Sequence, residues 1–205
     1  MIIDLSELSA NQVYYTLIQT LIPRPVAWVL SENSGGNYNL APFSYFSGVC
    51  SDPPLVMISV GQKPDGSNKD TRVNILERPN FVIHIANRNL TSAVTGSSAS
   101  LAYGESELEQ LGLATEPFEG CPLPRLSNAP IAFACELYDH HNIGRSEQQT
   151  MIFGEVKQIY VDDAAAQRDD KGRLTVDARA VDPIARLGGN DYTTFGELIT
   201  VPRPK

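Results

Sequence analysis

The sequence predicts a mainly β protein, an antiparallel barrel with short helices at its ends. Strand-like apolar segments recur along the chain, and turns or short helical stretches join them. Strands do not alternate regularly with long helices, which is the pattern of a doubly wound parallel sheet. Because antiparallel neighbours need only short connections, this spacing favours a barrel.

The first strand is expected at residues 26–30, where Trp28 and Leu30 share one face and Ala27 and Val29 the other. Prolines on both sides of Arg24 fix the backbone that enters this strand. The other elements expected in this half are a Ser-Gly-Gly-Asn turn at 34–37, a returning strand at 38–46, an apolar strand at 55–60 and a polar loop at 61–68.

A short helix should begin near Asp70 or Thr71, either of which can cap it, and end before Pro79. Asn89 is expected to cap a second short helix from Leu90. The remaining expected elements are a strand at 81–86, a helical turn or two at 104–111, and two long strands at 131–139 and 151–161.

Composition excludes several classes of protein. The 205 residues fit one domain, 1–205, and the net charge of −8 argues against general nucleic-acid binding, which needs excess Lys and Arg. No apolar run approaches the roughly 20 residues of a membrane span. Cys50, Cys121 and Cys135 are odd in number and lack C-x-x-C spacing, so we expect reduced thiols, neither disulfides nor a zinc site, and a cytoplasmic protein.

Common catalytic motifs are missing from the sequence. It has no G-x-S-x-G, H-E-x-x-H, P-loop or G-x-G-x-x-G after a strand. His84 lies in an apolar strand and is expected to be a satisfied core or interface residue. His140 and His141 are adjacent on a strand and should point to opposite faces, so they are unsuited to share one metal. We therefore expect neither a metal site nor a hydrolytic triad.

The segment 39–44, Asn-Leu-Ala-Pro-Phe-Ser, is unusual for a strand interior. Pro42 removes a backbone donor, and the small Ala41 and Ser44 would let a flat ligand approach the main chain. Composition alone gives more weight to another interpretation, an edge strand with a bulge at Pro42.

Lys69, Asp70 and Thr71 stand where a helix is expected to begin. Free N–H groups at a helix start suit a phosphate, and a lysine and a hydroxyl can add a charge and a further donor. Asp70 would repel a phosphate, so capping is its expected role. A capped, solvated helix start is the simpler interpretation of these residues alone. Ser59, Val60 and Gly61 end the preceding strand, where their backbone could meet a ligand.

Taken together, these segments closely resemble the flavin reductase-like family of FMN-binding split β-barrels, and in particular the flavoredoxin-like proteins and the reductase components of two-component monooxygenases. The resemblance runs from about Leu21 to Val201. Its segments are PRPVAWV at 23–29, NLAPFSYF at 39–46, SDPPLVMISVG at 51–61, KDT at 69–71 with Asn74 and Ile75, and RLGG at 186–189 with Tyr192.

The resemblance implies a six-stranded antiparallel split barrel, a homodimer, and FMN in a groove near the subunit interface. It also implies roles for individual residues. The ring and ribityl chain would lie against Asn39, Ala41, Pro42, Phe43 and Ser44, with Ser59, Val60 and Gly61 as the opposite rim; Lys69 and Thr71 would hold the phosphate; and Gly189 and Tyr192 would close over the ring.

In such a protein the flavin accepts a hydride from NADH or NADPH, and backbone donors stabilise the charge of the reduced ring. A protein of this kind needs no dedicated catalytic acid, base or nucleophile, and we expect none. The expected function is thus an NAD(P)H-dependent flavin oxidoreductase that passes electrons to flavin, a monooxygenase or another acceptor. One alternative is an FMN electron carrier that has no turnover of nicotinamide. Another is a non-catalytic barrel that binds a different ligand.

Overall fold

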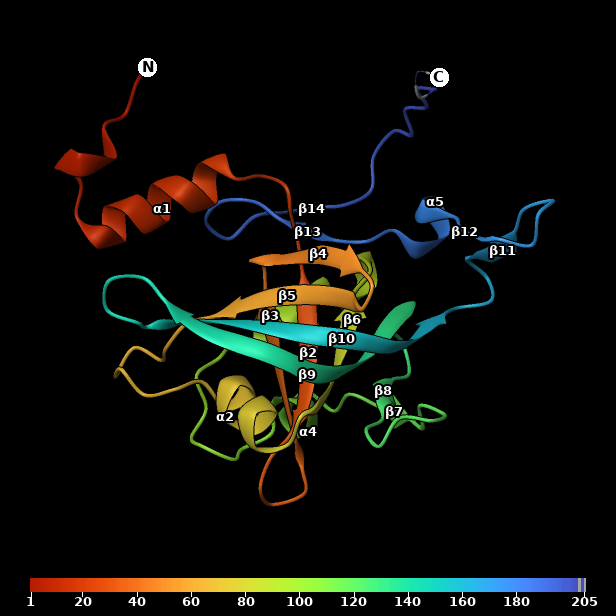
Figure 1. Cartoon of the computed structure of the whole chain (residues 1–205), viewed down its shortest axis with the longest axis horizontal. Helices are drawn as coiled ribbons and strands as arrows, with labels where there is room; N and C mark the ends of the chain where they lie inside the picture. The colour runs from red at the N-terminus through yellow and green to blue at the C-terminus, as the bar shows by residue number, and fades with distance from the viewer. Residues whose placement is uncertain (203, 205) are drawn as a thin grey trace.

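The computed structural model describes residues 1–202 and 204, and it is built around one seven-stranded antiparallel sheet (Figure 1). The strand order is β3-β2-β6-β9-β10-β5-β4. The strands are β2 (Ala27–Glu32), β3 (Tyr38–Phe43), β4 (Phe46–Ser51), β5 (Pro54–Val60), β6 (Asn80–Ile85), β9 (Ile131–Ile143) and β10 (Gln149–Val161).

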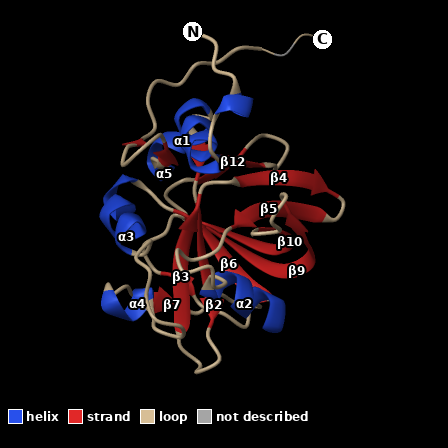
Figure 2. Cartoon of the chain, turned by 90° about the vertical axis from the view of Figure 1, so that its left-hand side faces the viewer, coloured by secondary structure: helices blue, strands red, loops and turns tan. Residues whose placement is uncertain are grey.

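The two edges of this sheet are consecutive in the chain. β3 forms one edge and β4 the other, and only Ser44 and Tyr45 separate them. The N–H of Ser59, on β5, donates to the carbonyl of Tyr45 at 2.9 Å. The chain therefore crosses from one edge to the other at this corner, and the sheet is strongly curled (Figure 2). Buried side chains fill the space that it encloses.

Strands β2 and β6 are buried on both faces, which is why they read as continuous apolar runs. In β2, Ala27 and Val29 join the core inside the barrel, whereas Trp28 and Leu30 join a second core outside it. The inner core is completed mainly by strand residues, and the outer one by residues of the helices and loops that cover β2 and β6.

Short elements cover the barrel. In Figure 1, α1, β13, β14 and α5 lie above the sheet, and α2 and α4 lie below it. The helices are η1 (Leu5–Glu7), α1 (Ala10–Thr20), α2 (Asp70–Glu77), η2 (Arg88–Leu90), α3 (Thr91–Gly96), α4 (Glu107–Gln110) and α5 (Ala178–Val181). Three small sheets pair β1 (Arg24–Pro25) with β13 (Ala185–Arg186) and β14 (Tyr192–Thr193), β7 (Thr115–Glu116) with β8 (Arg125–Leu126), and β11 (Ala166–Arg168) with β12 (Leu174–Val176).

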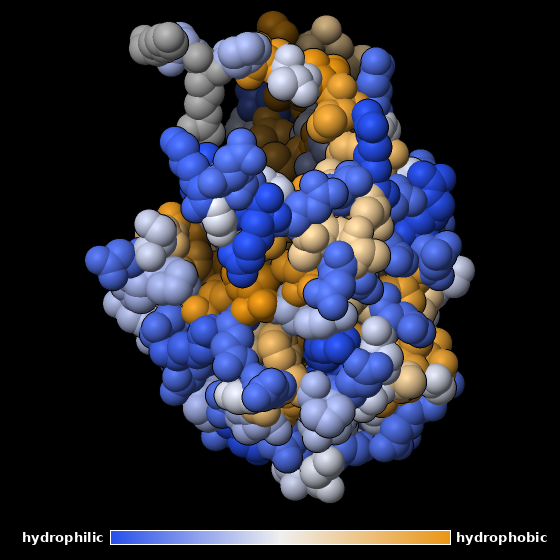
Figure 3. All heavy atoms as spheres, turned by 90° about the vertical axis from the view of Figure 1, so that its right-hand side faces the viewer, coloured by the Kyte–Doolittle hydropathy of each residue, from blue (hydrophilic) through white to orange (hydrophobic). Residues whose placement is uncertain are grey.

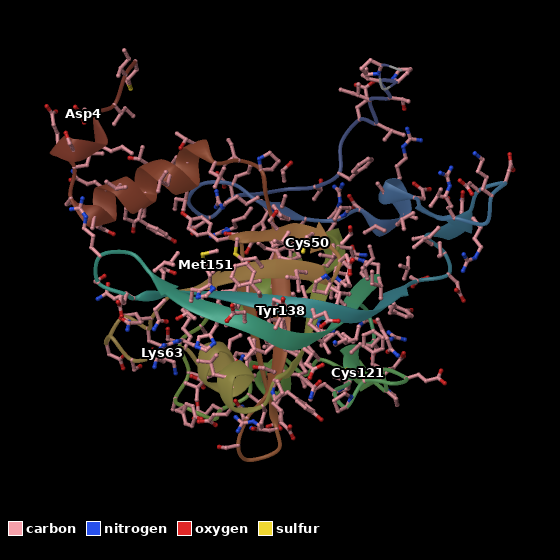
Figure 4. The ribbon with its side chains drawn as sticks, viewed as in Figure 1. Asp4, Cys50, Lys63, Cys121, Tyr138 and Met151 are labelled. Atoms are coloured by element: carbon pink, nitrogen blue, oxygen red, sulfur yellow. The ribbon has the colours of Figure 1, made fainter. Side chains whose placement is uncertain are left out.

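The surface mixes charged and apolar residues. Figure 3 shows apolar side chains in patches between hydrophilic ones on the face of the β11–β12 hairpin, where Leu174 and Val176 are exposed. Within residues 1–202 and 204, none of the helices has the length and apolar character needed to span a bilayer. Cys50, Cys121 and Cys135 are free thiols, and Cys50 and Cys121 lie well apart in Figure 4.

The mainly β antiparallel barrel expected from the sequence is confirmed, with one strand more than the six expected. Residues 38–46 are not one strand, because the chain leaves one sheet edge after Phe43 and joins the other at Phe46. β3 is the edge strand that its composition indicates, but it has no bulge: Pro42 pairs in register with Trp28.

Two expected helix caps were wrong. Lys69, rather than Asp70 or Thr71, is the N-cap residue of α2, and it caps through backbone conformation, without a side-chain hydrogen bond. Asn87, rather than Asn89, caps η2. The sequence analysis did not anticipate α1, although Ser9 and Gln12 form a capping box at its start.

Candidate functional site

Two adjoining cavities lie where the barrel edges meet. The larger has a volume of about 320 Å³ and the smaller about 70 Å³, and Pro42 and Lys69 line both. The larger cavity is bounded by the ends of β3 and β5, by α1 and by the segment after β13; the smaller lies between β3, the start of α2 and residues 97–101.

Ten of the twelve residues singled out in the sequence line these cavities. Pro42, Phe43, Ser44, Ser59, Gly61, Lys69 and Gly189 line the larger one, and Asn39, Ala41, Pro42, Lys69 and Thr71 the smaller one. They come from four separate parts of the chain. The barrel therefore brings the three resemblance segments at 39–46, 51–61 and 69–71 together at one place.

Val60 and Tyr192 do not line either cavity. The Val60 side chain points into the barrel core, because successive side chains of β5 alternate and its neighbours Ser59 and Gly61 face the cavity. The Tyr192 hydroxyl accepts a hydrogen bond from Thr95 Oγ1 at 3.2 Å, and its ring packs on the outer core.

Arg24 holds three walls of the larger cavity together. It is 4% exposed. Its Nη1 donates to the carbonyls of Ile18 (2.7 Å) and Leu21 (2.6 Å), its Nη2 to the carbonyl of Leu187 (2.9 Å), and its Nε to Ser44 Oγ (3.2 Å). This one side chain thus joins the end of α1, the loop after β13 and the turn between the two sheet edges.

Sequence reasoning missed Arg24 as a site residue because its flanking prolines were interpreted only as a strand entry. It also missed lining residues that come from the unexpected helix α1 and from long-range packing. Gln149 is an example: it lies at the start of β10, and a Cβ on Gly61 would come within 3.0 Å of its Nε2. The other missed residues of the larger cavity are Tyr14, Ile18, Tyr45, Gln62, Arg186 and Leu187.

Lys69 is a desolvated cation at the junction of the cavities. Burial lowers the pKa of its ammonium group. Its Nζ lies 5.5 Å from the centroid of the Phe43 ring. Across the described chain, the ion pairs do not include Lys69. An anion in either cavity would therefore stabilise its charged form.

Thr71 offers a hydroxyl proton to the smaller cavity. Asn39 Nδ2 donates to Thr71 Oγ1 at 2.9 Å, so the threonine oxygen is the acceptor of that bond and its own proton is left to donate. Both side chains are buried, Asn39 being 3% and Thr71 1% exposed. The hydroxyl therefore has a fixed position at the start of α2, where the first N–H groups of the helix also point outwards.

The two carboxylates beside the smaller cavity are already engaged. Asp70 was expected to cap α2; instead, its Oδ1 lies 2.5 Å from Lys63 Nζ and its Oδ2 accepts the N–H of Gly104 at 3.1 Å. Glu107 Oε2 accepts the N–H of Leu40 at 3.0 Å, and burial raises the pKa of this carboxyl. Lys63 therefore offsets the charge of Asp70, which reduces its repulsion of an anion.

His84 is a satisfied core residue, as the sequence indicates. It is fully buried; its Nε2 accepts the N–H of Leu126 at 3.0 Å, so its Nδ1 carries the proton and donates to the carbonyl of Trp28 at 3.1 Å. Burial lowers its pKa to about 4. In the part of the chain that the structure describes, no group of three or more His, Cys, Asp and Glu side chains is placed to hold a metal.

The flavin reductase like domain profile matches residues 19–182, which is most of the chain and includes the cavity-lining strands β3 and β5. The chain belongs to the flavin reductase-like family.

Solved structures of similar proteins agree with this family membership. Nitrilotriacetate monooxygenase component B from Bacillus cereus is 33% identical, with a TM-score of 0.88 over 98% of both chains. The 2-nitrobenzoate 2-nitroreductase NbaA from Pseudomonas fluorescens is 32% identical, with a TM-score of 0.85 over 100% of this chain and 96% of that one. A split barrel domain protein from Shewanella frigidimarina has a TM-score of 0.83 at 22% identity, covering 98% and 96% of the chains, and shows the same fold.

Proposed function

We propose that this flavin reductase-like chain binds FMN across the two adjoining cavities and is an NAD(P)H-dependent flavin oxidoreductase. The observation that carries the proposal is the pair of cavities joined at Lys69. The larger would take the ring and the smaller the phosphate, with the ribityl chain passing Pro42.

The phosphate end of the proposal depends on Lys69 and Thr71. Lys69 is a cation whose charge burial disfavours, and the Thr71 hydroxyl has a proton to donate at a helix start. A phosphate dianion would pair with both, and charge-assisted hydrogen bonds of this kind are the strong ones. Riboflavin, which lacks the phosphate, would gain nothing from either group.

The ring end depends on shape and on the backbone. Pro42 and Gly61 bring the main chain close to the cavity with little side-chain bulk, and Ser44 and Ser59 supply hydroxyl groups. Tyr14 and Ile18, one turn apart on α1, form an apolar wall. These groups would bind and orient a flat ring and exclude water from one side of it.

The flavin itself would supply the redox chemistry, accepting a hydride from NADH or NADPH. The protein then needs no acid, base or nucleophile of its own. The cavity fits that division of work, because its polar lining residues are hydroxyl, amide and cationic groups with no carboxylate among the described residues. The three free cysteines suit the reducing cytoplasm, where we place the protein.

Anaerobic spectroscopy tests the proposed activity. The holoprotein mixed with NADH or NADPH should lose its visible flavin band, and a monooxygenase component or free flavin should then accept the electrons. If the protein binds FMN and neither nicotinamide bleaches it, the protein is an electron carrier that accepts electrons from another protein. If the protein stays colourless when FMN is added, it is a barrel for another ligand.

Binding measurements test the phosphate assignment. Lys69→Met and Thr71→Val remove the charge and the hydroxyl while keeping similar volumes. Together they should weaken FMN binding about 30- to 900-fold and riboflavin binding little, because each lost hydrogen bond to the phosphate costs about 1–2 kcal/mol. Lys171→Met, which removes an exposed lysine, is the matched control. Equal losses for the two ligands would place the phosphate elsewhere.

A second candidate function is direct reduction of an aromatic organic acceptor. An apolar cavity of about 410 Å³ adjoins the larger cavity and shares Arg24, Ser44, Tyr45 and Ser59 with it. Met151, which Figure 4 labels on β10, is among its other lining residues. The similar protein NbaA is described as a nitroreductase. Oxidation of the bleached holoprotein by 2-nitrobenzoate under anaerobic conditions would support this candidate, and an unchanged spectrum would reject it for that compound.

A further inference from the structure

The larger cavity carries an unusual concentration of positive charge. Its charged lining residues are Arg24, Lys69 and Arg186, and its described lining includes neither aspartate nor glutamate. The whole chain, by contrast, has a net charge of −8. Three cations around one hollow, with low-dielectric walls, focus a positive potential there.

The hydrogen-bond partners of the two arginines leave that charge in place. Arg24 donates only to backbone carbonyls and to the Ser44 hydroxyl. Arg186 Nη2 donates to the carbonyl of Gly189 at 2.7 Å, and its guanidinium lies 4.6 Å from the Tyr192 ring centroid. Carbonyls and hydroxyls satisfy donors but carry no net charge. Among the described residues, no carboxylate forms an ion pair with Arg24, Lys69 or Arg186.

The other titratable groups at this cavity do not offset the cations. Tyr14 faces it from α1 and Tyr45 from the turn between β3 and β4; burial raises the pKa of Tyr45, which keeps that phenol neutral. Asp191 follows the Gly188–Gly189 turn, and its side chain is exposed; it contacts Arg186 through its carbonyl oxygen, at 3.5 Å from Nη1. Asp70 and Glu107 line only the smaller cavity.

We infer that the larger cavity binds its ring more tightly when the ring is anionic, and that Arg186 tunes the potential of the bound flavin. The inference rests on the proposed function. Two electrons and one proton added to an oxidised flavin leave one additional negative charge on the ring, whereas two electrons and two protons leave it neutral. With Lys69 paired to the phosphate, Arg24 and Arg186 remain as cations beside the ring and favour the first product.

Arg186 is the member of this set that can be changed with least damage to the site. Arg24 ties three chain segments together, and Lys69 is assigned to the phosphate. Arg186 makes its hydrogen bonds within one short turn, to residues three and five positions further along the chain. Its role in the site is to supply positive charge beside the ring. Its replacement should therefore change the midpoint potential of the bound flavin and change the affinity for oxidised FMN much less.

The experiment measures the midpoint potential of the holoprotein and its variants, with dithionite as reductant and a reference dye. Arg186→Gln should weaken reduced FMN about tenfold relative to oxidised FMN, which lowers a two-electron potential by about 30 mV. Arg186→Lys keeps the charge and should retain most of the wild-type potential. Arg179→Gln, which removes an exposed arginine on α5, is the control and should leave the potential unchanged.

The pH dependence of the wild-type potential provides a second measurement. At neutral pH it should show uptake of one proton for two electrons; uptake of two would overturn the inference. Equal midpoint potentials in Arg186→Gln and the wild type would also overturn it. Equal decreases of the potential in Arg186→Gln and Arg186→Lys would overturn it too, because they would show that packing rather than charge sets the potential. Failure of the wild type to bind FMN would instead reject the proposed function, so the two failures can be told apart.

Discussion

At the scale of single residues, buried polar groups decide where ligand chemistry and stability are located. His84 is the clearest case for stability, because both ring nitrogens have backbone partners and the ring is fully buried. Such a histidine is neutral in the folded protein. Its charged form would have to enter the core, where no described carboxylate pairs with it.

His84 should make the protein less stable in acid. Its folded-state pKa of about 4 lies below the ordinary value of about 6.5, so the unfolded chain takes up a proton first as pH falls. Stability from this residue is complete above pH ~6.5 and is lost as pH falls towards ~4, by up to about 1.4 kcal/mol per pH unit. Urea unfolding of the wild type at several pH values measures this slope.

His84→Gln should be less stable at neutral pH, since it disturbs two buried backbone partners, but it should show a flatter dependence on pH between ~6.5 and ~4. The exposed His140→Gln change is the matched control. A slope in His84→Gln as steep as that of the wild type would assign the acid sensitivity to the carboxylates.

At the scale of elements, α1 depends on very few contacts. The structure describes every residue of α1, and none of them is buried. Arg24 holds the end of α1 by donating two hydrogen bonds, to the carbonyls of Ile18 and Leu21. Gln19 packs closely against Gly188. The capping box at Ser9 and Gln12 organises its start.

Arg24→Met should loosen α1 and the loop after β13 while β6 stays protected. Each lost hydrogen bond from the buried guanidinium leaves an acceptor without its donor, and we expect a loss of about 2–4 kcal/mol in the free energy of unfolding. Hydrogen exchange measures the local effect: amides of residues 10–20 should exchange faster than in the wild type. Faster exchange throughout the sheet, with no excess in α1, would contradict the local role.

The sequence predicted those elements whose signals are local. The apolar runs of β2, β5 and β6 are visible in the sequence because these strands bury most of their side chains. Both faces of β2 and β6 are buried, and one face of β5 is buried. The break between β3 and β4 was not visible, because Ser44 and Tyr45 lack the glycine or proline of a typical turn and the change of sheet edge is a property of the closed barrel. Helix α1 was missed although Val13, Tyr14, Leu17 and Ile18 lie on one of its faces, because the sequence analysis did not use that helical spacing.

The candidate site divides in the same way. Lys69 and Thr71 were accessible to sequence reasoning, because a helix start has a local signature. Arg24, Gln149 and Arg186 were not, since their place in the site depends on strands and loops more than eighty residues apart that meet only in the folded chain. Tyr192 shows the converse: it belongs to a recognisable segment, yet its hydroxyl contacts Thr95 outside the cavities.

At the scale of the whole molecule, we expect a homodimer. Apolar side chains of α1 and the segment after it are exposed, including Tyr14 (51%), Tyr15 (54%), Leu21 (58%) and Ile22 (49%). An apolar surface of this extent next to a cavity is typical of an interface between subunits. Light scattering after size-exclusion chromatography should give twice the mass of the 22.4 kDa chain, and a monomeric mass at micromolar concentration would reject the dimer.

That residues 1–205 form one domain also stays a prediction.

The crossing at Ser44 and Tyr45 has a consequence for the energetics of the barrel. Ser44 and Tyr45 join the two edge strands of the sheet, β3 and β4, and also line the larger cavity. A ligand in that cavity would therefore lie where the two edges are connected. Ligand binding and closure of the barrel therefore stabilise each other. The free energy of binding adds to the free energy of unfolding of the barrel. The melting temperature of the protein should accordingly rise with the concentration of the ligand.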